Sequence, residues 1–301
     1  MSKTKTARVL SVQQSTSWWS DFQLLVKFKL TTLVVLTSAL AYFIAVGVDM
    51  NLITLVLLSL GGFLVTGAAN ALNQVIEKEF DSQMDRTKDR PVAAGRMTIS
   101  QGVIIAGISL IAGTVMLTII HPLAGLLGML SVVMYAFVYT PMKRFTTLAV
   151  PVGAIPGAMP VLIGYVAGSG EVTTLAITLF AIQFLWQFPH FWSVAFLSHD
   201  DYMKAGFKFL HSEQDGSPDR QLGLYSFVYA VILLFVAIGA SVLGYTGWIG
   251  GLLLVGISAY YAWKSWLFYK SFDRISARKL MFSSFSYILI ALICFMLNGV
   301  V

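Results

Sequence analysis

Cysteine and charged residues are both scarce in this sequence. The single cysteine, Cys294, lies in the last apolar run, which excludes a disulfide framework and a thiolate metal site. Lys, Arg, Asp and Glu make up only 11% of the 301 residues, whereas soluble domains carry about 25%. Hydrophobic residues make up 57%, and the mean hydropathy is +0.78. The sequence therefore predicts an integral membrane protein.

The N-terminal segment lacks an apolar core of signal-peptide length. It is polar and carries Lys3, Lys5 and Arg8, so we expect no cleavable signal. Residues 1–24 are expected to form a cytoplasmic polar segment, and residues 25–301 a single transmembrane domain.

Apolar runs long enough to cross a bilayer recur along the rest of the chain, since about 20 apolar residues make one span. We predict nine transmembrane helices, at residues 25–47, 53–76, 99–120, 122–140, 147–167, 172–197, 222–244, 246–268 and 280–299. The expected fold class is an all-α membrane bundle.

Basic residues are absent from one side of this predicted topology. All twenty Lys and Arg fall in the N-terminal segment, at the start of the first helix, or in the loops at 78–96, 143–144, 204–220 and 264–279. The positive-inside rule places the N-terminus in the cytoplasm and, after nine spans, the C-terminus outside. Topology thus accounts for the net charge of +6, and we expect no nucleic-acid partner.

The predicted membrane interior contains no Asp, Glu, Lys or Arg, apart from residues at the cytoplasmic helix ends. Proton pumps and ion-coupled transporters usually keep ionisable groups at depth. This argues against a secondary transporter, although the interruption of the fifth helix around Pro156 keeps that alternative open.

The most charged stretch follows the second predicted helix. If the helix continues, Asn73, Glu77 and Asp81 recur every four residues and face one side, with Asn70 one turn earlier. Mg²⁺ takes oxygen ligands and commonly binds one or two carboxylates plus substrate phosphate. The stripe is therefore a candidate metal site, and Asp85 is a candidate for a further acid beside it.

Basic residues come directly after these acids. Arg86, Lys88 and Arg90 can bind phosphate oxygens, and arginine can do so with two hydrogen bonds. The alternative is a solvated cytoplasmic loop that is basic because of its topology. That rule counts bases, however, and gives no reason for acids in helical phase.

A second stretch of acids and bases follows the sixth predicted helix, on the same side. It contains Asp200, Asp201 and Lys204, while Lys143 and Arg144 end the fourth helix nearby. Two acidic helix ends at one mouth could hold two Mg²⁺ ions and one diphosphate, with the bases neutralising the remaining charge. The alternative is again a loop of solvated acids.

The end of the sixth predicted helix is aromatic and contains a histidine. His190 is flanked in sequence by Trp186, Phe188, Phe191 and Trp192. It could be a satisfied interior residue, contact a porphyrin propionate, ligate iron or act as a general base.

Taken together, these motifs resemble those of the intramembrane prenyltransferases of the UbiA superfamily over nearly the whole chain. The most specific elements are Asn73-x3-Glu77-x3-Asp81, Asp-Arg-Thr-Lys-Asp-Arg-Pro at 85–91, and the aromatic and Asp-Asp-Tyr-Met-Lys-Ala-Gly stretch at 184–206. The first element is shared with quinone prenyltransferases, whereas the last is similar to the heme-farnesylating branch. The family motif usually has Asp where this chain has Glu77, which keeps the charge on a longer side chain.

The resemblance implies a nine-helix bundle around a central cavity open to the cytoplasmic side and to lipid. It implies transfer of the farnesyl group of farnesyl diphosphate to the 2-vinyl group of heme B, giving heme O for a terminal oxidase. Heme B would be a substrate rather than a cofactor, and Mg²⁺ would bridge the diphosphate. The expected location is the bacterial inner membrane, with contact to heme A synthase or terminal oxidase assembly. A quinone-type aromatic prenyltransferase is the alternative.

The resemblance also implies roles for individual residues. The expected metal ligands are Asn73, Glu77, Asp81, and Asp200 or Asp201, with Asp85 as a further catalytic acid. The expected diphosphate ligands are Arg86, Lys88, Arg90, Lys143, Arg144 and Lys204. The expected heme and prenyl pocket contains Asn70, Trp186, Phe188, His190 and Trp192, whose aromatic faces could stabilise an allylic cation.

Overall fold

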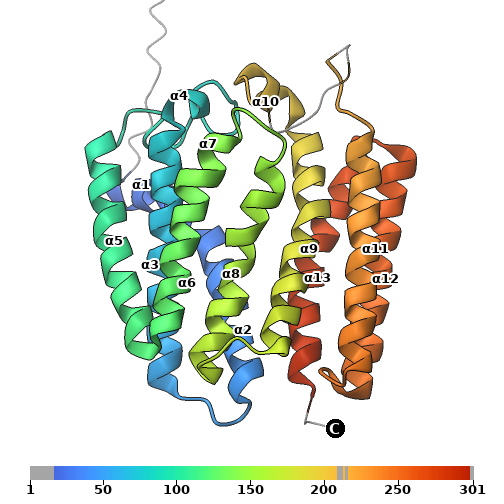
Figure 1. Cartoon of the computed structure of the whole chain (residues 1–301). Helices are drawn as coiled ribbons and strands as arrows, with labels where there is room; N and C mark the ends of the chain where they lie inside the picture. Colours follow the sequence, from blue (N-terminus) through green and yellow to red (C-terminus); the bar gives the residue numbers. More distant parts are fainter. Residues whose placement is uncertain (1–16, 209–212, 214–215, 299–301) are drawn as a thin grey trace, which may run out of the picture.

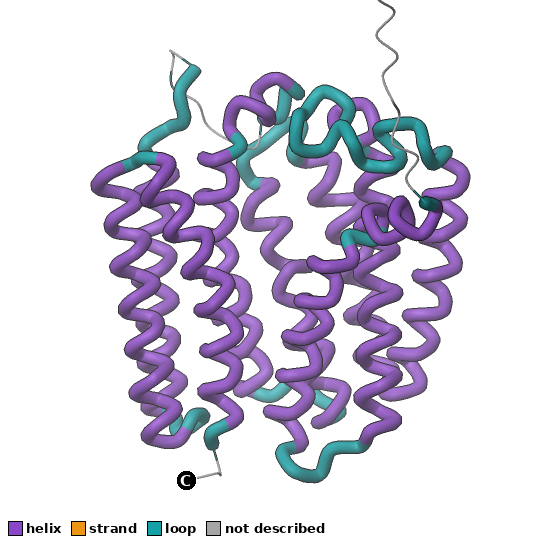
Figure 2. Tube along the Cα trace, turned by 180° about the vertical axis from the view of Figure 1, so that it is seen from behind, coloured by secondary structure: helices purple, strands orange, loops and turns teal. Residues whose placement is uncertain are grey.

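The elements of the structure are all helices, arranged as one bundle of long, roughly parallel rods (Figures 1 and 2). The structure is a computed structural model, and it describes residues 17–208, 213 and 216–298. Residues 1–16 of the expected N-terminal segment lie outside the described part.

Long helices occupy every predicted span. They are α2 (Phe28–Val46), α3 (Leu52–Ile76), α5 (Ile99–Ile120), α8 (Ala149–Ser169), α9 (Thr174–Leu197), α11 (Gln221–Val242), α12 (Gly247–Ser271) and α13 (Arg274–Met296). One more span is continuous through α6 (Pro122–Val132), the π-helix η1 (Val133–Tyr139) and α7 (Thr140–Met142). Three short helices complete the list: α1 (Trp18–Leu25), α4 (Lys78–Asp81) and α10 (His199–Lys204).

Within the described residues, seven helices are long and apolar enough to cross a membrane. They are α2, α3, α5, the segment from α6 to α7, α8, α11 and α13. The chain is therefore a multi-pass membrane protein. The helices α9 and α12 lie where the sixth and eighth spans are predicted but are not among the seven.

Two predicted helix starts are wrong. The first span does not begin at residue 25, because α1 ends at Leu25 and Lys27 adopts a left-handed backbone conformation, with φ 49° and ψ 56°, before α2 begins. The last helix begins at Arg274 rather than 280, because Asp273 and Ser276 form a capping box that satisfies the first free backbone N–H groups.

Small residues let the helices at the centre approach one another closely. A Cβ atom on Gly164 of α8 would lie 1.9 Å from the Ser38 carbonyl oxygen of α2. A Cβ atom on Gly113 of α5 would lie 2.8 Å from the Gly61 carbonyl oxygen of α3. The helix α8 also packs on α6 and α9, so it forms the middle of the bundle. The short helices α4, α7 and α10 gather at one end, at the top of Figure 1.

Candidate functional site

The side chains of Asn73, Glu77 and Asp81 follow one another by single helical turns across the junction of α3 and α4. Glu77 N donates to the Asn73 carbonyl at 2.9 Å, and Asp81 N donates to the Glu77 carbonyl at 2.8 Å. The predicted four-residue stripe therefore continues although α3 ends at Ile76. The three residues are only 2%, 2% and 0% exposed, so their polar groups need partners inside the protein.

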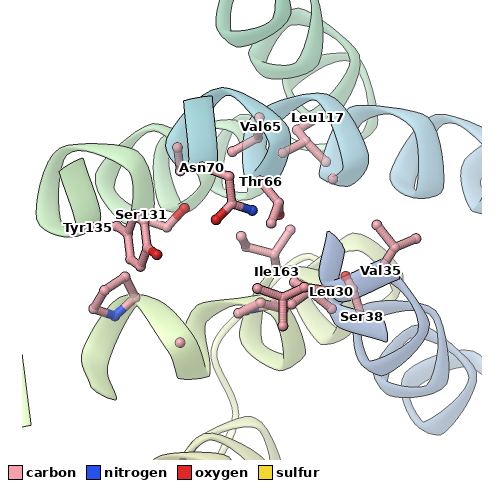
Figure 3. Close-up of a pocket in the computed structure, with 16 residues that line it drawn as sticks. Leu30, Val35, Ser38, Val65, Thr66, Asn70, Leu117, Ser131, Tyr135 and Ile163 are labelled. Carbon is pink, nitrogen blue, oxygen red and sulfur yellow. The ribbon is translucent and has the colours of Figure 1, made fainter. Parts of the chain in front are cut away.

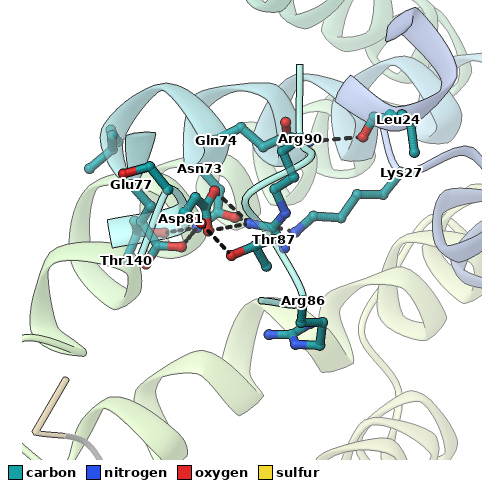
Figure 4. A network of polar contacts seen from close by, with 12 residues as sticks. Leu24, Lys27, Asn73, Gln74, Glu77, Asp81, Arg86, Thr87, Arg90 and Thr140 are labelled. Atoms are coloured by element: carbon teal, nitrogen blue, oxygen red, sulfur yellow. Dashed lines mark hydrogen bonds and ion pairs between the residues drawn. The ribbon is translucent and has the colours of Figure 1, made fainter. Parts of the chain in front are cut away.

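Basic side chains provide those partners (Figure 4). The contacts are Arg90 Nη1 with both Asp81 carboxylate oxygens at 2.8 Å, Lys143 Nζ with Glu77 Oε1, and Lys27 Nζ with Asn73 Oδ1 at 3.2 Å. Three bases thus face two carboxylates. The excess of positive charge at a buried position suits the binding of an anion.

The protonation of the cluster reflects its burial. Burial raises the pKa of the Asp81 carboxyl, which Arg90 opposes. Burial, together with the charges of Arg90 and Lys143, lowers the pKa of Lys27 to about 7. A bound anion would stabilise the protonated form of Lys27, because opposite charges favour the charged state.

A magnesium ion fits this donor set when it arrives with a diphosphate. Among the residues that the structure describes, no three His, Cys, Asp or Glu side chains are grouped so as to hold a metal ion. Two carboxylates and one amide oxygen are nevertheless the type of ligand that Mg²⁺ takes alongside substrate phosphates. Each donor already contacts an ammonium or guanidinium group, which stands in for the cation.

The structure brings the second acidic stretch into contact with the first. Arg86 N donates to Asp201 Oδ2 at 3.3 Å, and Arg86 Nη2 donates to the Tyr202 hydroxyl at 3.0 Å. Lys204 Nζ lies 3.4 Å from Asp85 Oδ2. The loop after α4 therefore lies against α10, at the same end of the bundle.

Asp200 and Asp201 differ in their surroundings. The Asp200 side chain is 86% exposed, whereas Asp201 accepts the hydrogen bond from Arg86 N. Of the two neighbouring acids, Asp201 is the one that faces the first stretch.

Two of the predicted phosphate ligands have other contacts. Arg144 Nη2 donates to the Ile76 carbonyl at 2.8 Å, and its guanidinium lies 4.2 Å from the Phe80 ring centroid. This places a positive charge at the C-terminus of α3, where the helix dipole favours it. Lys88 forms an exposed ion pair with Asp85 at 2.7 Å.

An apolar pocket begins one turn below Asn73 (Figure 3). Residues of α2, α3, α5, α6, η1 and α8 line it, among them Leu30, Ser38, Gly62, Thr66, Asn70, Leu117, Tyr135, Gly157 and Ile163. Asn70 Nδ2 donates to Thr31 Oγ1 at 3.2 Å, which holds the amide in the pocket wall. The charged rim, made of Lys27, Glu77, Asp81, Arg90 and Lys143, lies above this pocket. A charged rim and an apolar pocket together suit a ligand with an anionic head and a hydrocarbon chain.

Phe188 and Trp192 line a different pocket, next to Tyr225 and Tyr229 of α11. Val150 and Pro151 of α8 also line this pocket, so Phe188 and Trp192 lie between α8 and α11. Gln187 Nε2 donates to the Ala154 carbonyl of α8 at 3.0 Å, and Phe188 lies about 100° further around the helix axis. Phe188 and Trp192 thus lie outside the pocket below Asn73, and their expected contact with heme or the prenyl chain stays a prediction.

Trp186 and His190 instead face α13. Trp186 Nε1 donates to the Ser284 carbonyl at 2.7 Å, and His190 Nδ1 lies 2.8 Å from Ser284 Oγ. Neither lines the pocket below Asn73.

Three residues that reach the site were not predicted from the sequence. Asn73 Nδ2 donates to Thr140 Oγ1 at 3.1 Å, Thr140 Oγ1 donates to the Tyr135 carbonyl at 2.8 Å, and Tyr135 lines the pocket. The π-helix η1 positions both, and such turns often occur at functional sites. The third is Lys27, whose only sequence signal is a base at the start of an apolar run.

Solved structures share this fold. Digeranylgeranylglyceryl phosphate synthase matches with a TM-score of 0.76 and 16% identity, over 93% of this chain and 98% of that chain. A UbiA homolog from Archaeoglobus fulgidus, bound to GPP and Mg²⁺, matches with a TM-score of 0.67 and 12% identity, over 92% and 99% of the two chains.

Sequence relatives are more similar. The protoheme IX farnesyltransferase of Christiangramia forsetii is 39% identical, over 94% of this chain and 95% of its own length. The human mitochondrial protoheme IX farnesyltransferase is 34% identical, over 86% of this chain and 57% of its own length. The profile of the UbiA prenyltransferase family matches residues 34–290. The chain therefore belongs to the UbiA prenyltransferase family and groups within it with the protoheme IX farnesyltransferases.

Proposed function

We propose that this protein transfers the farnesyl group of farnesyl diphosphate to the 2-vinyl group of heme B and so makes heme O. The observation that carries the proposal is the near-full-length similarity to protoheme IX farnesyltransferases, at 39% identity. The buried acid and base cluster above an apolar pocket supports it independently, because a prenyl diphosphate has an anionic head and a hydrocarbon chain.

The proposed topology has nine spans, with α9 and α12 as the two beyond the seven apolar ones. Lys and Arg at the end that carries α4, α7 and α10 support a cytoplasmic location for that end. The N-terminus is then cytoplasmic and the C-terminus periplasmic. The bacterial relatives support the inner membrane as the location.

The diphosphate binds at the charged rim in this proposal. Asn73, Glu77 and Asp81 would hold Mg²⁺, and Asp201 would join them from α10. Bound Mg²⁺ neutralises the charge that develops on the departing oxygens.

In this proposal the basic side chains at the rim bind the diphosphate in place of the carboxylates that they now contact. Arg90, Lys143 and Lys27 already lie at the stripe, and Arg86 and Lys204 lie on the α10 side. Arg90 can offer two parallel N–H groups to a phosphate, whereas with Asp81 a single nitrogen, Nη1, contacts both carboxylate oxygens.

The farnesyl chain occupies the pocket below Asn73. Its C1–O bond breaks, and both electrons leave with the diphosphate. The terminal vinyl carbon of heme B bonds to C1, water adds its oxygen to the adjacent carbon, and one proton is released. Apolar walls keep water from the allylic cation before the vinyl group attacks.

The test is to express the chain in a bacterial membrane that lacks its own heme O and to separate the extracted hemes by chromatography. Heme O should accumulate with the intact chain. Accumulation of heme B alone, with the protein present at normal abundance, would contradict the proposal. Supplying heme B and 4-hydroxybenzoate together in vitro distinguishes the quinone-type alternative, for which the prenylated benzoate would be the product.

A further inference from the structure

We infer that Nε2 of His190 binds the iron of the heme substrate as an axial ligand. The inference rests on the proposed function for the identity of the ligand, but its geometry comes from α9 and α13. It assigns a chemical role to a histidine that lines neither the charged rim nor the pocket below Asn73.

Hydrogen bonds to Ser284 decide which ring nitrogen carries the proton. Ser284 Oγ donates to the Met281 carbonyl at 2.6 Å and lies 2.8 Å from His190 Nδ1. A hydroxyl has one hydrogen. The short 2.6 Å contact favours placing that hydrogen on the Met281 carbonyl, and Nδ1 of His190 is then the donor in the second contact. The lone pair is then on Nε2.

This arrangement is the one found for histidines that bind metals. A metal-bound imidazole almost always donates its other N–H to an oxygen, which fixes the tautomer and the ring orientation. Neutral imidazole bound to heme iron is a common proximal ligand. Within the described residues, no hydrogen bond is made to His190 Nε2, so the lone pair is available.

Aromatic neighbours fix the plane of the ring. Trp186 stacks on His190 with ring centroids 5.4 Å apart and an interplanar angle of 14°, and Phe285 meets it edge-on at 5.1 Å. Trp186 Nε1 in turn donates to the Ser284 carbonyl at 2.7 Å. One face of the imidazole is thus covered by the Trp186 ring, and Phe285 restricts its rotation. Such rings also suit contact with a flat porphyrin.

The position of His190 on α9 brings it near both substrates of the proposed reaction. Gln187 lies one turn deeper and meets Gly157, which lines the apolar pocket. His190 is rotated about 60° from Gln187, between α8 and α13, and α2 packs on both of those helices. From His190, α9 continues about 10 Å towards α10 and the charged rim. A heme held here lies beside the prenyl pocket, at the side of α2.

The other described histidines are placed differently. His121 lies at the opposite end of the bundle, where its Nδ1 accepts from Leu123 N and caps α6. His199 is buried next to Asp200 at the start of α10. His121 therefore serves as a matched control.

The test uses heme binding to the purified full chain in detergent, without farnesyl diphosphate, so that its outcome does not depend on turnover. Ferric heme is titrated and followed by its Soret band and by electron paramagnetic resonance. The intact chain should give a histidine-ligated spectrum. His190→Gly should lose that spectrum and bind heme at least tenfold more weakly, and added imidazole should restore the spectrum. His121→Asn, which keeps a capping side chain, should behave as the intact chain does.

A second variant separates ligation from folding. Ser284→Ala keeps the imidazole but removes its hydrogen-bond acceptor, and should weaken heme binding roughly tenfold, as loss of an outer partner does. An unchanged spectrum in folded His190→Gly would overturn the inference. If heme O formation fails while the His190 signature is present, the proposed reaction is wrong but the ligand assignment holds.

Discussion

The two acidic helix ends are alike in composition but not in environment. At the end of α4, which follows α3, Asp81 is fully buried and paired with Arg90. At the end of α9, Asp200 is 86% exposed, and His199 is the only buried residue of α10. The loop after α4 contacts the first end, since Thr87 Oγ1 donates to the Asp81 carbonyl at 3.0 Å and Arg90 Nη1 to its carboxylate at 2.8 Å.

The comparison extends to the pockets below. The pocket below Asn73 is lined mainly by aliphatic and small side chains, whereas half of the residues that line the pocket between α8, α9 and α11 are aromatic, namely Phe188, Trp192, Tyr225 and Tyr229. The two acidic ends therefore differ in the pockets of the bundle as well as in their own burial. Burial together with paired bases distinguishes the first end.

The largest expected effect is at Asp81. Asp81→Asn keeps the shape but removes the charge, and should lower heme O formation by about a hundredfold or more, as loss of a group that stabilises developing charge does. The matched control is Asp200→Asn, which should keep near-normal turnover because its side chain faces water. Turnover is measured per amount of folded protein in membranes. Equal losses of turnover in Asp81→Asn and Asp200→Asn would contradict the distinction between the buried and the exposed acid.

The pocket below Asn73 should select the length of the prenyl chain. A Cβ atom on Gly62 would meet only Val35 Cγ2, at 3.8 Å, so a larger side chain fits but fills the pocket. Gly62→Leu should lower use of farnesyl diphosphate relative to geranyl diphosphate by about tenfold, the low end for methylene-scale discrimination. Competition between the two donors, read by mass spectrometry, measures this.

The control for that substitution is in the other pocket. Trp192→Phe should leave the donor preference unchanged, because Trp192 does not line the pocket below Asn73. A change of preference in Trp192→Phe, with none in Gly62→Leu, would reverse the assignment of the two pockets.

A smaller effect on turnover is expected at Asp201, where α10 contacts the loop after α4. Asp201→Asn should reduce turnover about tenfold, the low end of the loss for groups that support a metal site, and should raise the magnesium concentration needed for half-maximal rate. Asp201 contacts Arg86 N, whereas Asp200 does not. If Asp200→Asn shows the magnesium effect instead, the assignment between the two acids is wrong.

The smallest effect should follow Lys88→Ala. Lys88 pairs with Asp85 in solvent, and exposed pairs contribute little to stability. Neither the thermal midpoint in detergent nor the rate should change measurably. A large loss of rate would assign Lys88 to the diphosphate site.

Much of the architecture follows from local pattern, because membrane spans and helical phase are properties of short stretches. The positions of the long helices and the one-turn spacing of Asn73, Glu77 and Asp81 are of this kind. The left-handed residue Lys27 and the π-helix η1 were not predicted, since no apolar period signals either.

The sequence does not determine which neighbouring helix each side chain faces. Phe188 and Trp192 are close in sequence to Trp186 and His190, which contact α13, yet they line a separate pocket between α8 and α11. Which neighbour each face of α9 meets depends on the packing of the whole bundle. The same applies to Arg144, whose partner is the carbonyl of Ile76 on another helix.

The left-handed conformation of Lys27 has a consequence for engineering. An L-residue with a side chain costs roughly 1–2 kcal/mol in that region, so a chain selected for thermal resistance alone would carry glycine there. Lys27→Gly should relax the backbone and remove a base from the rim, and so melt later while turning over more slowly. At Lys27, a substitution that raises the thermal stability is therefore expected to lower the turnover rate.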